Sequence, residues 1–120
     1  AYYKFEKAFT VRLQSEQQDA YLQTEVQLKL ESSHDQDLMK QFEPELKHRI
    51  TLTLMGKHAA DLGTAAGVQN LANELRDVAN RVVGAPPPKK RRPGVEQVPA
   101  DTAEPGDPVQ SVLFSTFIVQ

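Results

Sequence analysis

The sequence contains no cysteine, no tryptophan and no long hydrophobic run. The absence of cysteine excludes disulfide scaffolds, thiolate zinc sites and cysteine nucleophiles. Its apolar runs are only a few residues long, whereas a membrane-spanning helix needs about 20 apolar residues. Neither sign of charge dominates, because 14 Lys and Arg residues are matched by 16 Asp and Glu residues, for a formal net charge of -2. This balance argues against a dedicated nucleic-acid-binding domain, which is usually clearly basic.

The composition is that of a folded protein. Hydrophobic residues make up 39% of the chain and charged residues 25%, which differs from the composition of a disordered chain. A length of 120 residues supplies one hydrophobic core and leaves too little chain for a second, so we expect one domain over residues 1–120. The chain begins at Ala1 without a methionine or a signal peptide, and we therefore expect a part of a longer protein.

Two segments in the first third of the chain alternate as half-buried strands do. In Phe9–Leu13 every second residue is apolar. The stretch 22–30 alternates strictly, and one of its faces consists of Leu22, Thr24, Val26, Leu28 and Leu30. One apolar and one polar face are typical of an antiparallel sheet. We expect the two strands to form a hairpin with a loose turn.

The middle of the chain has helical periodicity. A first apolar stripe steps by three and four residues through Leu38, Met39, Phe42, Leu46, Ile50 and Leu54. Pro44 interrupts this stripe, which predicts a kink or a new helix with Pro44 in its first turn. A second stripe consists of Val68, Leu71, Ala72, Leu75, Val78, Ala79 and Val82. Thr64 is its expected N-cap, and Gly63 and Gly84 mark its two ends.

The final segment, 109–120, is predicted to be a strand that is apolar on both faces. By alternation, Val112, Phe114 and Ile118 point one way, and Leu113, Phe117 and Val119 point the other way. One face should pack on the helices, and the other should be covered by more of this chain or by a neighbour. The predicted element order is β-β-α-α-β, which describes an α+β domain with helices grouped between strands.

Seven of the eight prolines lie between Pro86 and Pro108, inside a segment that is poor in large apolar residues. We expect residues 85–108 to form a flexible loop outside the core. This segment contains one basic run, Lys89, Lys90, Arg91 and Arg92. The run is a candidate contact for nucleic acid, anionic lipid or a nuclear import receptor. A solvated loop is the simpler interpretation, because acidic residues follow directly and no aromatic residue is near to stack on bases.

Groups that could carry chemistry are few. His34 precedes Asp35 and Asp37, but three such residues at a helix start are more simply capping groups than metal ligands. His48 and His58 are ten residues apart, which does not fit ligands on one helix. The carboxylates that flank Pro44 suit the first turn of a helix better than acid–base catalysis. No nucleophile, phosphate-loop or metalloprotease motif is present, so we expect no enzyme and no cofactor.

Five stretches together resemble the periplasmic domain of the FliL family of bacterial flagellar basal-body proteins. They are FTVRL at Phe9–Leu13, YLQTEVQLKL at Tyr21–Leu30, PELKHRITLTL at Pro44–Leu54, DLGTAAGVQNLANELRDVAN at Asp61–Asn80 and LFSTFIVQ at Leu113–Gln120. The last is the most distinctive, and it is similar to the family's F-x-x-F-[IV]-[IV]-Q ending. The resemblance covers most of the chain outside residues 85–108, a segment that is long for the family.

The resemblance implies a stomatin- or prohibitin-like (SPFH) fold, in which an antiparallel or mixed sheet carries a layer of two or three helices. It also implies a membrane anchor outside this chain, a periplasmic location at the bacterial inner membrane, and association with flagellar stator proteins and the basal body. Family members can assemble into rings around stator units and support motility. The candidate interaction surface is Leu113, Phe114, Phe117 and Val119.

Two other functions compete with this one. Fold does not determine function, so a stomatin-like membrane scaffold outside the flagellum is one alternative. Binding of an anionic polymer or lipid by residues 89–92 is the other, and such binding would weaken steeply with salt.

Overall fold

The computed structural model describes residues 1–16, 18–85 and 106–120, which form an α+β fold. Its strands are β1 (Tyr2–Lys4), β2 (Phe9–Leu13), β3 (Ala20–Leu30) and β4 (Val109–Val119). Its helices are α1 (His34–Gln41), α2 (Glu43–Met55) and α3 (Ala65–Val82), and a short 3₁₀ helix, η1 (Ala59–Leu62), lies between α2 and α3. Of the predicted loop 85–108, residues 86–105 lie outside the described residues.

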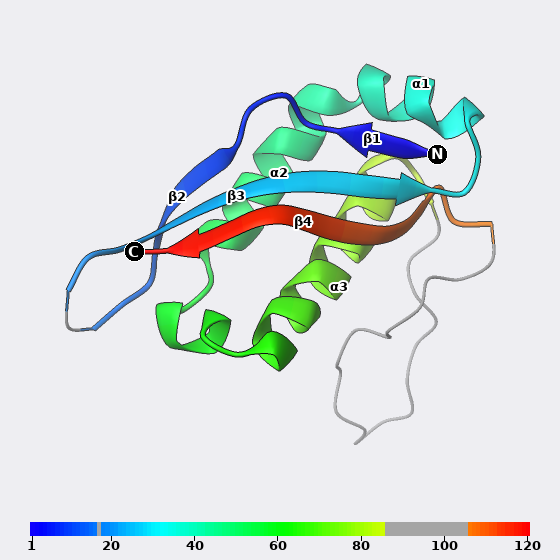
Figure 1. The fold of residues 1–120 in the computed structure, drawn as a ribbon. Helices are drawn as coiled ribbons and strands as arrows, with labels where there is room; N and C mark the ends of the chain where they lie inside the picture. The colour runs from blue at the N-terminus through cyan, green and yellow to red at the C-terminus, as the bar shows by residue number, and fades with distance from the viewer. Residues whose placement is uncertain (17, 86–105) are drawn as a thin grey trace, which may run out of the picture.

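β3 is the central strand of an antiparallel sheet (Figure 1). On one side it pairs with β2 and then with β1, so that Val11 lies opposite Leu22 and Tyr3 opposite Leu28. On the other side it pairs with β4 along almost its whole length. β4 therefore forms an edge of the sheet, and it reaches β3 across a long separation in sequence.

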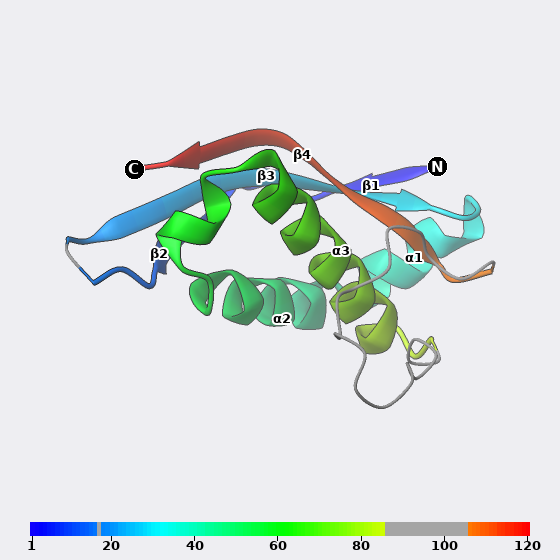
Figure 2. The same cartoon turned by 90° about the horizontal axis from the view of Figure 1, so that it is seen from below.

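The helices lie on one side of the sheet (Figure 2). The even-numbered residues of β3, from Ala20 to Leu30, are all buried toward this layer, as the alternation predicted. Facing them are fully or almost fully buried residues of α2 and α3, namely Leu46, Ile50, Leu54, Leu71, Leu75 and Ala79. The two strands predicted in the first third of the chain and both predicted helical stripes are therefore confirmed. Among the described elements, no helix covers the opposite face of the sheet.

One helix ends just before Pro44 and a new helix begins there, as predicted. α1 ends at Gln41, and Pro44 lies in the first turn of α2, where its missing N–H costs no hydrogen bond. Asp35 lies in the first turn of α1, as expected, and its Oδ2 accepts hydrogen bonds from the backbone N and the Oγ of Ser32, at 3.1 and 3.3 Å; the N-cap residue Ser33 makes no side-chain capping bond. The carboxylate of Glu43 forms an ion pair with Lys47 at 2.9 Å, one helical turn further on.

The ends of α3 are also as predicted. Thr64 is the N-cap, and its Oγ1 accepts a hydrogen bond from the backbone N of Gly67 at 3.0 Å. At the other end Gly84 has a φ of +90°, and the N–H of Ala85 donates to the carbonyl of Asn80 at 2.9 Å. This is the Schellman arrangement, which requires a residue in the left-handed region and therefore favours glycine.

The predicted element order lacks one strand and, because it counts α1 and α2 as one helical region, one α-helix. β1 precedes the two predicted strands, so the order in the described residues is β-β-β-α-α-α-β with η1 before α3. Three residues are too few to display a period, which is why alternation gave no signal there. Besides the pairing of β1 with β3, aromatic contacts hold this segment in place. Phe5 is buried and makes edge-to-face contacts with the rings of Tyr3 and Phe9.

Candidate interaction surface

β4 carries all four residues proposed as an interaction surface, but it does not divide them between its faces as predicted. Side chains directly opposite each other in antiparallel strands lie on the same face. Phe114 is opposite Val26 and Phe117 is opposite Thr24, and both of these β3 residues point into the core. Phe114 and Phe117 therefore share the inner face, and the prediction that they point in opposite directions is wrong.

A β-bulge causes this difference. The register shifts between Glu25 and Val26, so that Ser115 of β4 is an extra residue between Phe114 and Thr116. Because side chains alternate with a period of two, one extra residue reverses the face of every residue after it. Val119 consequently lies opposite Leu22 on the inner face, and Ile118 lies on the outer face.

Polar side chains form hydrogen bonds on both faces of the sheet at the bulge. The hydroxyl of Thr24, which is fully buried, donates to the carbonyl oxygen of Thr116 at 2.7 Å. On the outer face, the carboxylate of Glu25 accepts hydrogen bonds from the hydroxyls of Ser115 and Thr116, each at 3.2 Å. Thr24 is the only polar residue on the buried face of β3. Its bond to Thr116 explains why a polar residue occurs there, because a buried carbonyl oxygen needs a hydrogen-bond donor.

The two faces of β4 differ in how well they are covered. On the inner face the rings of Phe114 and Phe117 meet edge to face, with centroids 5.1 Å apart, and both rings are only partly buried against the core. On the outer face Leu113 and Ile118 are 42% and 43% exposed. β4 is thus apolar on both faces, as predicted, although the residues on each face are not those predicted.

Among the described strands, β4 pairs with β3 alone, so its other backbone edge, hereafter the free edge, has no strand partner. Antiparallel strands alternate between pairs that exchange hydrogen bonds and pairs that do not. Tyr21 and Gln120 exchange both bonds, at 2.9 and 2.8 Å, so the odd-numbered residues of β3 bond to β4. The β4 residues opposite even-numbered ones therefore direct their N–H and C=O groups away from β3; they are Val109, Val112, Phe114, Phe117 and Val119. No other described strand pairs with this edge.

Asn80 closes the beginning of this edge. Its Nδ2 donates to the carbonyl oxygen of Val109 at 2.9 Å, and its Oδ1 accepts from the backbone N of Val109 at 2.8 Å. The side-chain amide thus replaces a neighbouring strand for one residue. The apolar period of α3 gave no signal for this role, because Asn80 lies beside the predicted stripe, yet it is 5% exposed.

Replacing Asn80 with alanine should lower the free energy of unfolding by about 1–3 kcal/mol, because two backbone groups of Val109 lose their partners. Urea unfolding monitored by circular dichroism measures the change. Asn70→Ala is the matched control, since Asn70 is an exposed residue of the same helix and alanine favours helix formation there. Equal stability of the two variants would show that the Asn80 contact does not hold β4.

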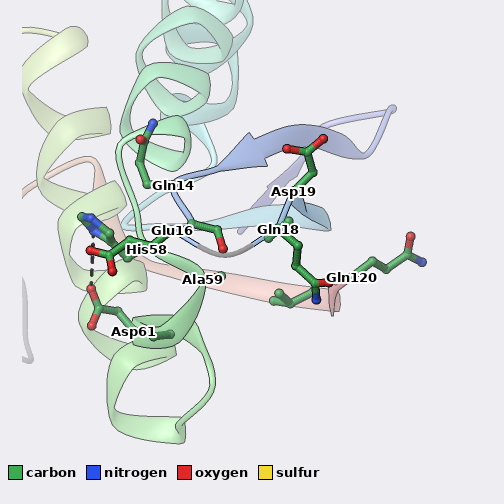
Figure 3. Close-up of a pocket in the computed structure, with 12 residues that line it drawn as sticks. Gln14, Glu16, Gln18, Asp19, His58, Ala59, Asp61 and Gln120 are labelled. Carbon is green, nitrogen blue, oxygen red and sulfur yellow. Dashed lines mark ion pairs between the residues drawn. The ribbon is translucent and has the colours of Figure 1, made fainter.

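A shallow hollow of about 650 Å³ lies beside the C-terminal end of β4 (Figure 3). The turn between β2 and β3, the segment from His58 to Asp61 and the last two residues of the chain line it. His58 Nδ1 is 3.9 Å from Asp61 Oδ2, and these side chains are 63% and 72% exposed. Catalytic acids and bases are usually tuned by burial, so this pair gives no basis for a chemical role.

One wall of the hollow is structural. The backbone N of Gln14 donates to the carbonyl of Lys57 at 2.9 Å, and the N of Ala59 donates back to the carbonyl of Gln14 at 3.0 Å. The Gln14 side chain adds a bond to the carbonyl of Met55 at 3.2 Å. These contacts join the end of β2 to the segment after α2, which positions η1 and the start of α3.

The remaining candidate residues are not brought together. His34 lies in α1, His48 in α2 and His58 before η1. In the part of the chain that the structure describes, no group of three or more His, Cys, Asp or Glu residues is placed to hold a metal ion. The basic run at Lys89, Lys90, Arg91 and Arg92 lies outside the described residues.

Comparison with known proteins identifies the family. The model of the family described as flagellar basal body-associated protein FliL matches residues 2–120. The chain belongs to the FliL family. The match confirms the resemblance noted in the sequence and associates this FliL-family chain with the bacterial flagellum and its basal body.

The search of curated proteins gives no match. Within the described residues, none of the helices combines the length and apolar character needed to cross a bilayer.

Proposed function

We propose that this chain is a non-enzymatic scaffold module that associates with the stator at the flagellar basal body, in the periplasm, and assembles there with further copies into a ring. The observation that carries the proposal is the family match over residues 2–120, essentially the whole chain. The stomatin- or prohibitin-like character of the fold and a membrane anchor outside this chain are parts of the same proposal.

The architecture supports a role in binding rather than in catalysis. A scaffold needs a stable core with accessible surfaces, and here the helices cover only one side of the sheet (Figure 2). The uncovered side carries Leu113 and Ile118 at the edge of the molecule, each more than two-fifths exposed. Exposed apolar side chains that lie near an unpaired strand edge are typical of contact surfaces.

The proposal is tested in the bacterium that carries the gene. Deleting the gene and complementing with the full-length protein should change two quantities together: the number of fluorescently labelled stator units at each motor, and the torque under high load. We expect both to fall in the deletion strain and to return on complementation. Flagellar filament number is the control, since loss of the filament would explain a motility defect without any stator role.

The alternative function, a membrane scaffold outside the flagellum, is tested by localising the protein in the same bacterium. A fluorescent fusion of the full-length protein should form foci at flagellar basal bodies. A uniform membrane signal, together with unchanged stator number and torque after deletion, would show instead that the chain acts as a membrane scaffold outside the flagellum. A salt-sensitive association with anionic vesicles would favour the alternative role of residues 89–92.

A further inference from the structure

The edge of β4 that faces away from β3 has few of the features by which proteins usually protect an edge strand. Residues 109–120 include no charged residue, no proline and no glycine. Natural edge strands are usually short, or carry lysine, proline or inward-pointing charges that prevent pairing with another chain. β4 is 11 residues long, and beyond Val109 no described strand covers its outer edge. β4 has two irregularities, register shifts that make Gln110 and Ser115 extra residues relative to β3.

The sequence around the bulge has an approximate two-fold symmetry. Reading outward in both directions from the bond between Ser115 and Thr116, residues of the same kind occur at equal distances: Ser115 with Thr116, Phe114 with Phe117, Leu113 with Ile118, and Val112 with Val119. The structure carries the same symmetry. Val112, Phe114, Phe117 and Val119 lie on the inner face with their backbone groups at the free edge, and Leu113 and Ile118 lie on the outer face.

We propose that β4 pairs antiparallel with β4 of a second copy of this chain, about a two-fold axis that passes between Ser115 and Thr116. In this register Val112 is opposite Val119 of the other copy, Leu113 is opposite Ile118, and Phe114 is opposite Phe117. The four residues whose N–H and C=O groups point outward then meet one another, as an antiparallel ladder requires. The two bulges coincide at the axis, so neither strand has an unmatched extra residue.

Side-chain chemistry fits the same register on both faces. On the inner face, the Phe114 and Phe117 rings of two copies would form a cluster of four and complete the burial that one copy leaves partial. On the outer face, each Leu113 would lie beside an Ile118, and these are among the most exposed large apolar residues of the described chain. No charge on β4 opposes the approach of a second copy.

This inference goes beyond the proposed function, and it has a different symmetry. A two-fold contact uses the same surface on both copies and is complete at two, whereas a ring needs head-to-tail contacts between different surfaces. Pairing through β4 therefore gives a dimer, and any ring must be built through another surface. The two proposals succeed or fail independently, because a motor phenotype does not require the β4 dimer.

Cysteine cross-linking tests the register directly, because the chain has no cysteine of its own. Leu113→Cys and Ile118→Cys are made in separate chains with different affinity tags, and both positions are exposed in the monomer. Directly opposite residues of this kind have Cα atoms about 4.5 Å apart, within the range of a disulfide. Like positions are five residues out of register, or about 17 Å apart along the strand, which is too far.

On mild oxidation at high protein concentration, we expect the mixture of the two variants to form the mixed dimer, and each variant alone to give only background. Leu52→Cys mixed with Ile118→Cys measures that background, since Leu52 is exposed on α2 in the helix layer. A mixed product no stronger than this control would overturn the proposal. Equally strong cross-linking of either variant with itself would also overturn it, because the strands would then pair in another register.

A charge exchange supplies a readout without cross-linking. The double variant L113K/I118E places Lys opposite Glu at both symmetry-related positions, whereas L113K/I118K places Lys opposite Lys. We expect Kd for dimerisation, measured by analytical ultracentrifugation at low salt, to be weaker by roughly tenfold or more in the second variant. Identical sedimentation of the two variants would exclude pairing in the proposed register.

Discussion

Replacing Gly67 with alanine is expected to destabilise the domain by roughly 3 kcal/mol or more, at the upper end of the range for overpacking a tight contact. A Cβ atom at Gly67 would lie 1.7 Å from the carbonyl oxygen of Asp61 and 3.2 Å from Oγ1 of the N-cap Thr64. The first of these is a backbone atom, so rotation of a side chain cannot relieve the clash. α3 would have to move away from η1, or its first turn would have to unwind.

The sign of this effect is what makes it diagnostic. In an ordinary helix, glycine to alanine stabilises by about 1 kcal/mol, so propensity predicts the opposite result. Gly56→Ala is the matched control, because Gly56 has a right-handed φ of -81° and an added Cβ would meet its nearest atoms at 3.6 and 3.7 Å, an ordinary contact. Chemical denaturation of both variants gives the comparison. A Gly67→Ala protein as stable as the parent would mean that Asp61 does not pack against α3.

Leu75→Ala should cost about 2–5 kcal/mol, the range for removing a buried leucine side chain and leaving a cavity. Leu75 is fully buried near the middle of α3, among core residues contributed by β3 and α2. A loss of this size is a large part of the stability of a small domain, so the variant should unfold at a much lower urea concentration.

The control for this truncation is Leu52→Ala in α2. It removes the same atoms from a helical leucine that is 49% exposed, so the free energy of unfolding should change by no more than about 0.5 kcal/mol. If both variants lost the same stability, the effect would come from helix propensity or from the unfolded chain rather than from the core contact of Leu75.

Most of the fold was predictable because its elements are long enough to show a period. The alternation through β3 and the stripe along α3 extend over many residues, and each identified a buried face that the structure confirms. Local chemistry placed the boundaries. Pro44 can be accommodated only in a first turn, Thr64 has a side chain that caps, and Gly84 accepts the left-handed conformation at the end of α3.

The surface residues were harder to place because each depends on one contact distant in sequence. The face of Phe117 depends on whether Ser115 is an extra residue relative to β3, and nothing in the alternation of β4 reveals this. Asn80 appeared to be a polar residue at the margin of an apolar stripe, since its partner Val109 is 29 residues away. Such contacts are properties of the assembled sheet, and a periodic pattern along one segment carries no information about them.

β3 pairs with β1 and β2 on one side and with β4 on the other. Hydrogen exchange of its backbone amides therefore reports separately on the opening of each side. Even-numbered amides such as Leu22 and Val26 face β2 and β1, whereas odd-numbered ones such as Gln23 and Gln27 face β4. Transient departure of β4 would expose only the odd-numbered set to solvent deuterium. The protection pattern along this single strand therefore records how firmly the distant C-terminal segment is held, separately from the stability of the N-terminal half of the sheet.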